Sequence, residues 1–162
     1  MIFVTVGTHE QQFNRLVEYM DKWALENDEK VIIQTGYSTY KPENAEWSKL
    51  FSYQKMVELV KQARIIITHG GPSSFIMPLQ IGKTPIVVPR RCKFNEHVND
   101  HQYTFCKEVE KRMGTIVVVD EVEKLGDEIE RYNAIKKEVE NISNNNKFCD
   151  KLEGVVEELF KR

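Results

Sequence analysis

Apolar residues along the chain fall into two patterns, short continuous runs and longer stretches with helical spacing. The runs are rich in β-branched residues, which is typical of strands buried on both faces. We expect such strands over 1–6, 30–35, 64–68, 84–88 and 115–119, and a further short strand over 49–53. Apolar residues at three- and four-residue intervals between the runs predict helices. These helices span about 11–25, 54–62 and 97–111, a short one begins at Pro72, and two finish the chain on either side of a break at 143–146.

Continuous apolar strands that alternate with helices predict an α/β fold, a doubly wound, Rossmann-like parallel sheet of five or six strands. The polar stretch 37–49 is expected to be a loop. No repeat, low-complexity segment or linker divides the 162 residues, so we expect one domain over 1–162. In open parallel sheets, ligands bind beyond the carboxyl ends of the strands, near the point where the strand order reverses. The strand-to-helix junctions are therefore the places to look for chemistry.

Composition narrows the classes of function. The 23 basic and 25 acidic residues give a formal net charge of −2, which offers no bulk attraction to nucleic acid or anionic lipid. No run reaches the ~18–20 apolar residues of a membrane span, and the N-terminus lacks the pattern of a signal peptide. Three cysteines without CxxC spacing fit a reducing compartment. We expect a cytoplasmic protein that does not bind nucleic acid.

The turn HGGPSS at 69–74 is the sharpest candidate for a phosphate site. Its two glycines would let a phosphate approach the backbone closely, and the helix that begins at Pro72 would direct free N–H groups and a positive dipole end towards it. Ser73 and Ser74 add hydroxyl donors. The alternative is a tight turn in which a glycine caps the helix and a serine satisfies its first turn.

Two further junctions lie on the same edge of the predicted sheet. The sequence GTH, which is Gly7, Thr8 and His9, follows the first strand and is a weaker signal, because a glycine is common there. The segment PRRCKFNEHVNDHQ at 89–102 follows a later strand and brings Arg90 and other basic residues that suit an anionic ligand. The alternative is that this segment binds no ligand and is the solvent-exposed N-terminus of a helix, surrounded by basic surface residues.

Within that segment, His97 and His101 have the i, i+4 spacing of a metal-binding pair on a helix. The glutamate that an HExxH motif places between them is missing, so no metal site is expected. In the alternative without a ligand, Asn95 would cap the helix that follows. His101 and Gln102 become candidates for ligand contact through their position at the sheet edge.

Familiar nucleotide-binding motifs are absent. No GxGxxG follows a strand, which disfavours a dinucleotide-dependent oxidoreductase. Gly82, Lys83 and Thr84 resemble the end of a P-loop, but Met77 stands where the first glycine of that motif is required. The stretch also precedes a strand, whereas a P-loop follows one. We interpret Gly82 as the residue that ends a helix.

Three blocks of the sequence resemble the glycosyltransferase family 28 C-terminal domain. They are VTVGTHEQQFNRLV at 4–17, ITHGGPSSFIMPLQIGKTPIVVPR at 67–90 and NEHVNDHQ at 95–102. The blocks follow the order and spacing of the family, and the resemblance covers nearly the whole chain. The sequence is most similar to the small donor-binding subunits of split bacterial glycosyltransferases for capsular polysaccharide or exopolysaccharide. Those subunits are similar to the cytosolic subunit of the two-part N-glycan UDP-N-acetylglucosamine transferase.

The resemblance implies one half of a GT-B enzyme, an inverting hexosyltransferase that moves a sugar from a UDP-sugar to a lipid-linked saccharide. The acceptor half would be a separate, membrane-associated subunit that holds the acceptor and keeps this chain at the inner face of the membrane. No cofactor is implied. The alternative is a non-catalytic nucleotide-binding or regulatory subunit that stabilises a catalytic partner. Self-association of the isolated chain is left open.

The resemblance also implies where the donor binds. The loop after the first strand would lie against the phosphates, FSYQKM at 51–56 would hold the uracil, and the turn at 70–74 and Gln102 would face the phosphates and the sugar. The expected substrate-binding residues are Gly7, Thr8, Phe51, Ser52, Tyr53, His69, Gly70, Gly71, Pro72, Ser73, Ser74, Arg90, His101 and Gln102.

Catalysis of this transfer needs charge stabilisation and a base. Helix N-termini and Arg90 or Arg91 would stabilise the negative charge that develops on the leaving UDP. His9 is the candidate catalytic base, because imidazole titrates in the required range. In two-domain relatives the base lies on the acceptor half.

Ribose recognition departs from the family pattern. Members commonly carry a glutamate that binds the ribose hydroxyls, and this chain has Met77 there, followed by Pro78, which is expected to kink the helix. A thioether does not accept hydrogen bonds as a carboxylate does. Recognition of the ribose would then fall to Gln80, Gln102 or backbone groups.

Overall fold

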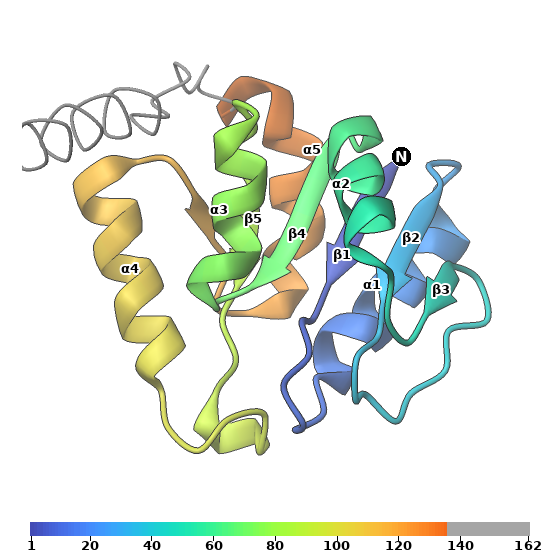
Figure 1. Ribbon diagram of the computed structural model, residues 1–162, viewed down its shortest axis with the longest axis horizontal. Helices are drawn as coiled ribbons and strands as arrows, with labels where there is room; N and C mark the ends of the chain where they lie inside the picture. Colours follow the sequence, from blue (N-terminus) through green and yellow to red (C-terminus); the bar gives the residue numbers. More distant parts are fainter. Residues whose placement is uncertain (136–162) are drawn as a thin grey trace, which may run out of the picture.

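The computed structural model describes residues 1–135, which form a parallel six-stranded sheet covered on both faces (Figure 1). The strands are β1 (Ile2–Thr5), β2 (Val31–Gln34), β3 (Glu46–Ser48), β4 (Ile65–His69), β5 (Ile86–Val88) and β6 (Val117–Val118). Their order in the sheet is β3-β2-β1-β4-β5-β6. The chain adds β2 and β3 on one side of β1 and then returns to place β4 on the other side. The strand order therefore reverses between β1 and β4, and the predicted α/β fold is confirmed.

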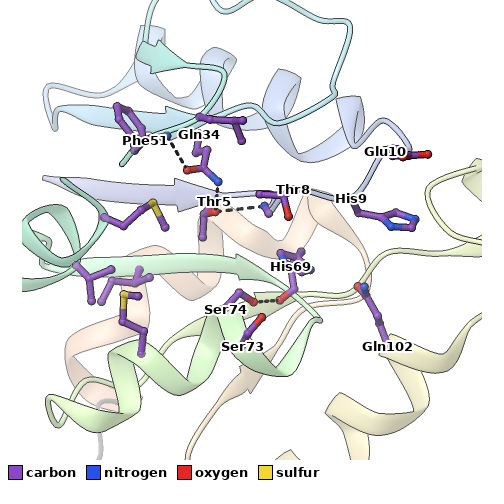
Figure 2. A pocket seen from close by; sticks show the side chains of 16 residues that line it. Thr5, Thr8, His9, Glu10, Gln34, Phe51, His69, Ser73, Ser74 and Gln102 are labelled. Atoms are coloured by element: carbon purple, nitrogen blue, oxygen red, sulfur yellow. Dashed lines mark hydrogen bonds between the residues drawn. The ribbon is translucent and has the colours of Figure 1, made fainter. Parts of the chain in front are cut away.

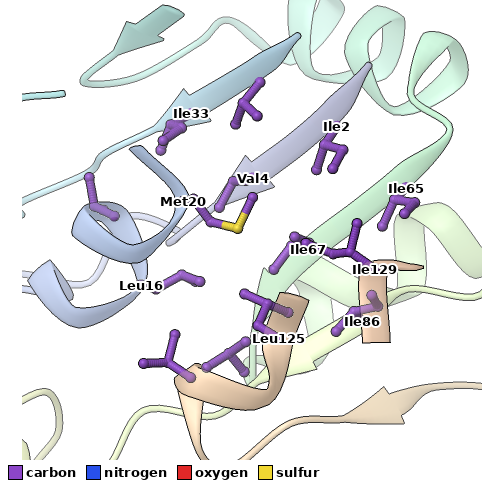
Figure 3. Close-up of a cluster of buried hydrophobic side chains, with 14 of the residues drawn as sticks. Ile2, Val4, Leu16, Met20, Ile33, Ile65, Ile67, Ile86, Leu125 and Ile129 are labelled. Atoms are coloured by element: carbon purple, nitrogen blue, oxygen red, sulfur yellow. The ribbon is translucent and has the colours of Figure 1, made fainter. Parts of the chain in front are cut away.

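Within residues 1–135, five α-helices cover the sheet, and the strand sequences show which helix lies on which face. They are α1 (Asn14–Glu26), α2 (Tyr53–Gln62), α3 (Pro72–Gln80), α4 (His101–Met113) and α5 (Leu125–Ile135). Ile2 and Val4 of β1 pack with α1 and α5 in the cluster drawn in Figure 3, whereas Phe3 between them packs with α2. Helices α3 and α4 cover the same face as α2, over β5 and β6. Side chains of a strand alternate between faces, so strands covered on both sides are apolar throughout.

The strand expected over 49–53 is wrong. The edge strand β3 is Glu46–Ser48, inside the stretch that was expected to be a loop. Glu46 and Trp47 of this strand are exposed, and β3 pairs only with β2. An edge strand with exposed side chains needs no apolar run, so hydrophobic patterning does not reveal it.

A buried carboxylate on α1 fixes the loop that leads into β3. Asp21 has no exposed surface and accepts hydrogen bonds from the backbone N–H groups of Glu43, Asn44 and Ala45 at 3.1, 2.8 and 2.9 Å. The Tyr40 hydroxyl donates to it at 2.9 Å, and this bond together with burial raises the pKa of Tyr40 to about 12. Burial alone would raise the pKa of Asp21, but the hydrogen bonds outweigh it and hold that pKa below its usual value.

The helix expected over 97–111 begins later, at His101. A short 3₁₀ helix (Cys92–Phe94) precedes it and ends at Asn95, whose φ of 56° is left-handed. Asn95 therefore closes this turn and does not cap α4. His97 lies outside the helix, so the helical spacing that suggested a metal pair with His101 does not exist.

The ends of α3 are confirmed. The helix begins at Pro72, and Gly82, with φ of 74°, donates its N–H to the Leu79 carbonyl at 3.0 Å just beyond the helix end. Pro78 lies inside α3.

The last predicted helix, after the break at 143–146, falls outside the described residues. Within residues 1–135, no helix combines the length and apolar character that crossing a membrane requires.

Candidate nucleotide site

A cavity of about 730 Å³ opens at the carboxyl ends of β1 and β4, where the strand order reverses. Its walls come from the loop after β1, the segment after β3, and helices α2, α3 and α4 (Figure 2). The residues that line it are Thr5, Gly7, Thr8, His9, Glu10, Gln34, Leu50, Phe51, Met56, Val60, Ile66, His69, Ser73, Ser74, Met77 and Gln102. Junctions far apart in the sequence thus meet at one site, as parallel-sheet topology predicts.

The cavity has two chemically different halves. The apolar half is formed by Phe51, Met56, Val60, Ile66 and Met77, which belong to one hydrophobic cluster between the sheet and helices α2 and α3. The polar half is formed by Thr8, His9, His69, Ser73, Ser74 and Gln102. Figure 2 shows Phe51 at one end of the cavity and His9 with Glu10 at the other.

His69, the last residue of β4, is wedged between two glycines of the polar half. Its side chain is buried, and its Nδ1 accepts a hydrogen bond from the Gly71 N–H at 3.0 Å. A Cβ at Gly7 would lie 2.3 Å from Nε2 of this ring, and a Cβ at Gly71 would lie 2.3 Å from Cε1. The imidazole therefore requires glycine at both positions. The sequence predicts that Gly70 and Gly71 leave room for a phosphate, but at Gly71 the His69 ring occupies that space.

Burial also fixes the charge of His69. Desolvation lowers the pKa of this imidazole to about 4, and the nearby positive charge of Arg90 adds to the shift. The ring is therefore neutral at pH 7. Because Nδ1 accepts the hydrogen bond from Gly71, Nε2 carries the proton of the neutral ring and acts as a donor.

The rest of the turn follows the structural alternative raised by the sequence. Gly71 occupies the position before α3, and the Ser74 hydroxyl bonds back to the carbonyls of Gly71 and His69 at 2.6 and 2.9 Å. A Cβ at Gly70 would lie 2.8 Å from Cβ of Gln102, so α4 packs directly against this turn. This close approach brings Gln102 to the edge of the cavity.

Arg90 does not line the cavity. Its side chain is fully buried, and Nη1 donates to the carbonyls of Gln11, Gln12 and Glu96 at 2.9, 3.0 and 3.1 Å. Nη2 donates to the carbonyl of Val6 at 2.8 Å. Burial lowers the pKa of Arg90 to about 10, which leaves it charged at neutral pH. The guanidinium therefore ties the loop after β1 to the segment before α4. The prediction that Arg90 contacts an anionic ligand is wrong, because the guanidinium points into the protein.

A buried ion pair supports the same segment. Arg15 of α1 meets Glu96 through two contacts of 3.0 Å, and the Glu96 side chain is 1% exposed. Arg91 pairs with Asp100 at 3.1 Å and with Asp120. Arg91, which was expected to stabilise the leaving UDP, is thus also paired with carboxylates of the protein itself.

Six other predicted site residues lie outside the cavity lining, and two of them are Gly70 and Gly71 of the turn described above. Ser52 caps α2 by accepting the Lys55 N–H at 3.3 Å, and the Tyr53 side chain is 75% exposed. Pro72 begins α3, and His101 begins α4 with an exposed side chain. In the segment expected to hold the uracil, the structure brings Phe51 into the cavity and leaves Ser52 and Tyr53 outside.

Sequence reasoning missed a polar bridge in the floor of the cavity. Gln34 Nε2 donates to the Thr5 hydroxyl at 3.3 Å, and Gln34 Oε1 accepts the Phe51 N–H at 3.2 Å. The Gly7 N–H also bonds to the Thr5 hydroxyl, at 3.2 Å. A glutamine at the end of the apolar run KVIIQT was the signal that could have pointed to this bridge. Met56, Val60 and Ile66, by contrast, carry no signal that separates them from ordinary core.

His9 reaches the cavity from the loop after β1. Its Nε2 lies 2.9 Å from Oε1 of Gln11, and its ring stacks on His97 with centroids 4.9 Å apart. Gln11 Oε1 is an acceptor, so this contact places the proton of a neutral ring on Nε2. Nδ1 then keeps the lone pair that a general base needs.

Comparison with known families identifies the chain. The glycosyltransferase family 28 C-terminal domain matches residues 1–156. This protein belongs to that family. The predicted family is therefore confirmed over nearly the full length of the sequence.

Solved structures similar to this family 28 domain agree on the fold. The calicheamicin glycosyltransferase aligns with 98% of this chain at a TM-score of 0.67 and 16% identity, and 44% of that structure is covered. The glycotransferase of kitacinnamycin aligns with 85% of this chain at a TM-score of 0.54 and 18% identity, with 38% of it covered. The domain thus spans less than half the length of these enzymes. Among curated proteins, no sequence matches it.

Proposed function

We propose that the cavity binds a UDP-sugar and that this chain is the donor-binding, catalytic subunit of an inverting glycosyltransferase. The observation that carries the proposal is the two-part cavity at the reversal of strand order, with an apolar half beside a helix N-terminus. Its volume of about 730 Å³ lies in the range of small-molecule sites. A nucleoside diphosphate has the matching pattern, a flat base whose ring faces can pack on apolar side chains at one end and phosphates at the other.

The two halves give the donor one orientation. The uracil would enter the apolar half beside Phe51, and the diphosphate would lie at the N-terminus of α3, near the Ser73 hydroxyl. The first backbone N–H groups of a helix lack partners within it and attract anions. The transferred sugar would then face Gln102 and the loop that carries His9.

Charge stabilisation in this site would come from neutral donors. Within residues 1–135, no lysine or arginine lines the cavity, and His69 is neutral at pH 7. The α3 N-terminus and the Ser73 hydroxyl would therefore stabilise the negative charge that develops on the departing UDP. Because these groups are already held in place by the fold, they need no reorganisation during the reaction.

The transfer would be a single displacement. An acceptor hydroxyl would attack the anomeric carbon from the side opposite UDP, its proton would pass to Nδ1 of His9, and the bond between the sugar and UDP would break. Attack from the opposite side inverts the configuration at that carbon. Among the cavity-lining residues within 1–135, His9 and His69 carry an imidazole, and only His9 is more than slightly exposed and has its hydrogen bond on Nε2 rather than on Nδ1.

The acceptor would be held by a separate chain. The domain spans less than half the length of the glycosyltransferases that share its fold. We propose that a membrane-associated subunit supplies the remaining half, binds a lipid-linked saccharide in polysaccharide biosynthesis and holds this chain at the cytoplasmic face of the membrane.

Calorimetric titration of the isolated chain with UDP tests the site. Ser73→Asp places a carboxylate in the first turn of α3, and we expect at least a tenfold loss of UDP affinity. Gln80, a predicted ribose contact, lies outside the cavity lining at the exposed far end of the same helix, so Gln80→Asp adds the same charge there and should leave the affinity within twofold. Equal affinities for the two variants, or no binding of UDP by the unmodified chain, would show that the cavity is not the donor site.

A second experiment separates a catalytic subunit from a non-catalytic nucleotide-binding one. The apolar character of Met77 at the cavity wall favours the second function, because it removes a polar contact to the donor. The unmodified chain and His9→Asn are combined with the acceptor-binding subunit, and sugar transfer is measured. A loss of about a hundredfold in transfer with unchanged UDP binding supports catalysis by His9. Unchanged transfer would assign the base to the partner.

A further inference from the structure

The apolar half of the cavity meets the polar half at Met77 of α3. The cavity surface formed by Met77, here called the wall, is apolar. Met77 follows Ser73 by four residues, so both side chains lie on the same face of α3, and both line the cavity. Under the proposed orientation, the base lies beside Phe51 and the diphosphate beside Ser73. The ribose that joins them must therefore pass Met77. A thioether is only a weak hydrogen-bond acceptor.

Two polar side chains that line the cavity between the strands are already engaged. Thr5 and Gln34 are 3% and 4% exposed, and they bond to each other and to backbone N–H groups that hold the surrounding loops. They therefore present little polar surface to a ligand. Gln102, which the sequence offered for ribose binding, lies in the polar half, where its Oε1 accepts the Arg90 N–H at 3.2 Å.

Carboxylates are also distant from this wall. Glu10 is the one acidic residue of the described chain that lines the cavity. It lies beside His9, at the end opposite Phe51 (Figure 2). A pair of ribose hydroxyls beside Met77 would thus meet no charged acceptor within residues 1–135.

We infer that the site does not select for the ribose 2′-hydroxyl and binds ribo- and 2′-deoxyribonucleoside diphosphates alike. This inference rests on the proposed function, because it assumes that the cavity holds the nucleotide. It extends the class of donors from sugars carried on uridine diphosphate to sugars carried on 2′-deoxyribonucleoside diphosphates. Discrimination at the ribose requires a polar partner that is left unsatisfied when the hydroxyl is missing, and the wall offers none.

The direct test compares UDP with dUDP, which differ by the one oxygen atom in question. Both dissociation constants are measured for the unmodified full chain by calorimetry. The inference predicts that the two constants differ by less than fivefold. If UDP binds and dUDP binds at least fivefold more weakly, the inference is wrong and the proposed function stands. If neither nucleotide binds, the proposed function fails, and the inference fails with it.

Met77→Glu supplies the missing acceptor. The new carboxylate would accept hydrogen bonds from the ribose hydroxyls, which are stronger than bonds between neutral groups, so UDP should gain at least a tenfold preference over dUDP. Repulsion between this charge and the diphosphate weakens both ligands equally and cancels in the ratio.

Ile76→Glu is the matched control, because its side chain is exposed and lies outside the cavity lining on the same helix. This control should keep the ratio of the unmodified chain. An unchanged ratio in Met77→Glu, with UDP still bound, would show that the ribose does not lie against α3 and would overturn the inference.

Discussion

The two halves of the cavity are built in different ways. The polar half consists of turns held by directed contacts, in which the His69 ring fills the space between Gly7 and Gly71. The apolar half consists of side chains such as Met56 and Val60 that project from a helix packed on the sheet. The polar half therefore depends on single atoms, whereas the apolar half depends on volume and hydrophobicity. Substitutions should be costly in the first and tolerated in the second.

This difference also separates two origins of a glycine-rich turn. The sequence HGGPSS indicated a phosphate site through the freedom of its glycines, yet close packing against His69 and α4 already requires glycine at Gly70 and Gly71. The anion-binding property comes instead from the α3 N-terminus that the turn precedes. A glycine motif can thus mark the right place for a reason other than ligand approach.

The largest expected effect on stability comes from the ion pair between Arg15 and Glu96, which supports the polar half of the cavity. Glu96→Ala removes a buried carboxylate and leaves the partly buried guanidinium of Arg15 without its charge partner, next to the buried charge of Arg90. We expect the free energy of unfolding to fall by about 3–5 kcal/mol. Glu108→Ala removes a carboxylate from an exposed pair with Arg112 and should cost under about 1 kcal/mol. Urea denaturation measures both, and equal costs would contradict the structural role of Glu96.

The next largest effect on stability is expected at the contact between His69 and Gly71. Gly71→Ala would place a methyl group 2.3 Å from the ring, and we expect a loss of about 2 kcal/mol in stability. In a His69→Ala background the same substitution should cost at least about 1 kcal/mol less, because the obstruction is gone. A cost that is equal in the two backgrounds, measured by urea denaturation, would show that the ring does not impose the glycine.

The buried imidazole also makes stability depend on pH. His69 keeps a folded-state pKa of about 4 against an ordinary value of 6.5, so between these values the unfolded chain binds a proton that the folded chain does not. Stability therefore falls as the pH drops through this window, by about 2 kcal/mol from pH 7.5 to pH 5.

His69→Asn should abolish most of this pH dependence, and His101→Asn, in which an exposed histidine is replaced, should retain it. Urea denaturation at the two pH values measures the difference. If both variants kept the full dependence, His69 would not be the residue responsible.

The smallest effect is expected in the apolar half. Met56→Leu changes shape but conserves hydrophobicity and nearly conserves volume, so it should cost less than about 1.5 kcal/mol in stability. UDP affinity should stay within threefold. A larger loss of affinity, with stability unchanged, would show that the apolar half also makes a specific contact to the nucleotide.

Sequence patterning predicted the fold better than the site. Continuous apolar runs located five of the six strands, because those strands are covered on both faces or packed against a helix. The edge strand at Glu46–Ser48 has no such run, and neighbouring strand contacts and the Asp21 bonds decide its place. Boundaries near His101 were displaced because Asn95 and the buried Glu96 bend the chain before the helix starts.

Within the site, the sequence indicated which junctions meet, but it did not determine where each side chain points. The topology of parallel strands places the loops that carry Thr8, Phe51 and Ser73 at one edge, and this follows from local patterning alone. Arg90 faces the interior because four carbonyl groups surround it, and three of them, from Val6, Gln11 and Gln12, are distant in the sequence. Such tertiary contacts have no local signature.

Nuclear magnetic resonance tests the central claim, that the cavity between β1 and β4 holds the nucleotide, most directly. Titration of the isotope-labelled chain with UDP should shift the backbone amide signals of Thr8 and Ser73 in the polar half together with those of Phe51 and Met56 in the apolar half. The account is contradicted if UDP shifts no signals, or if the shifts gather instead around the smaller cavity of about 420 Å³ that Lys107 and Lys124 line.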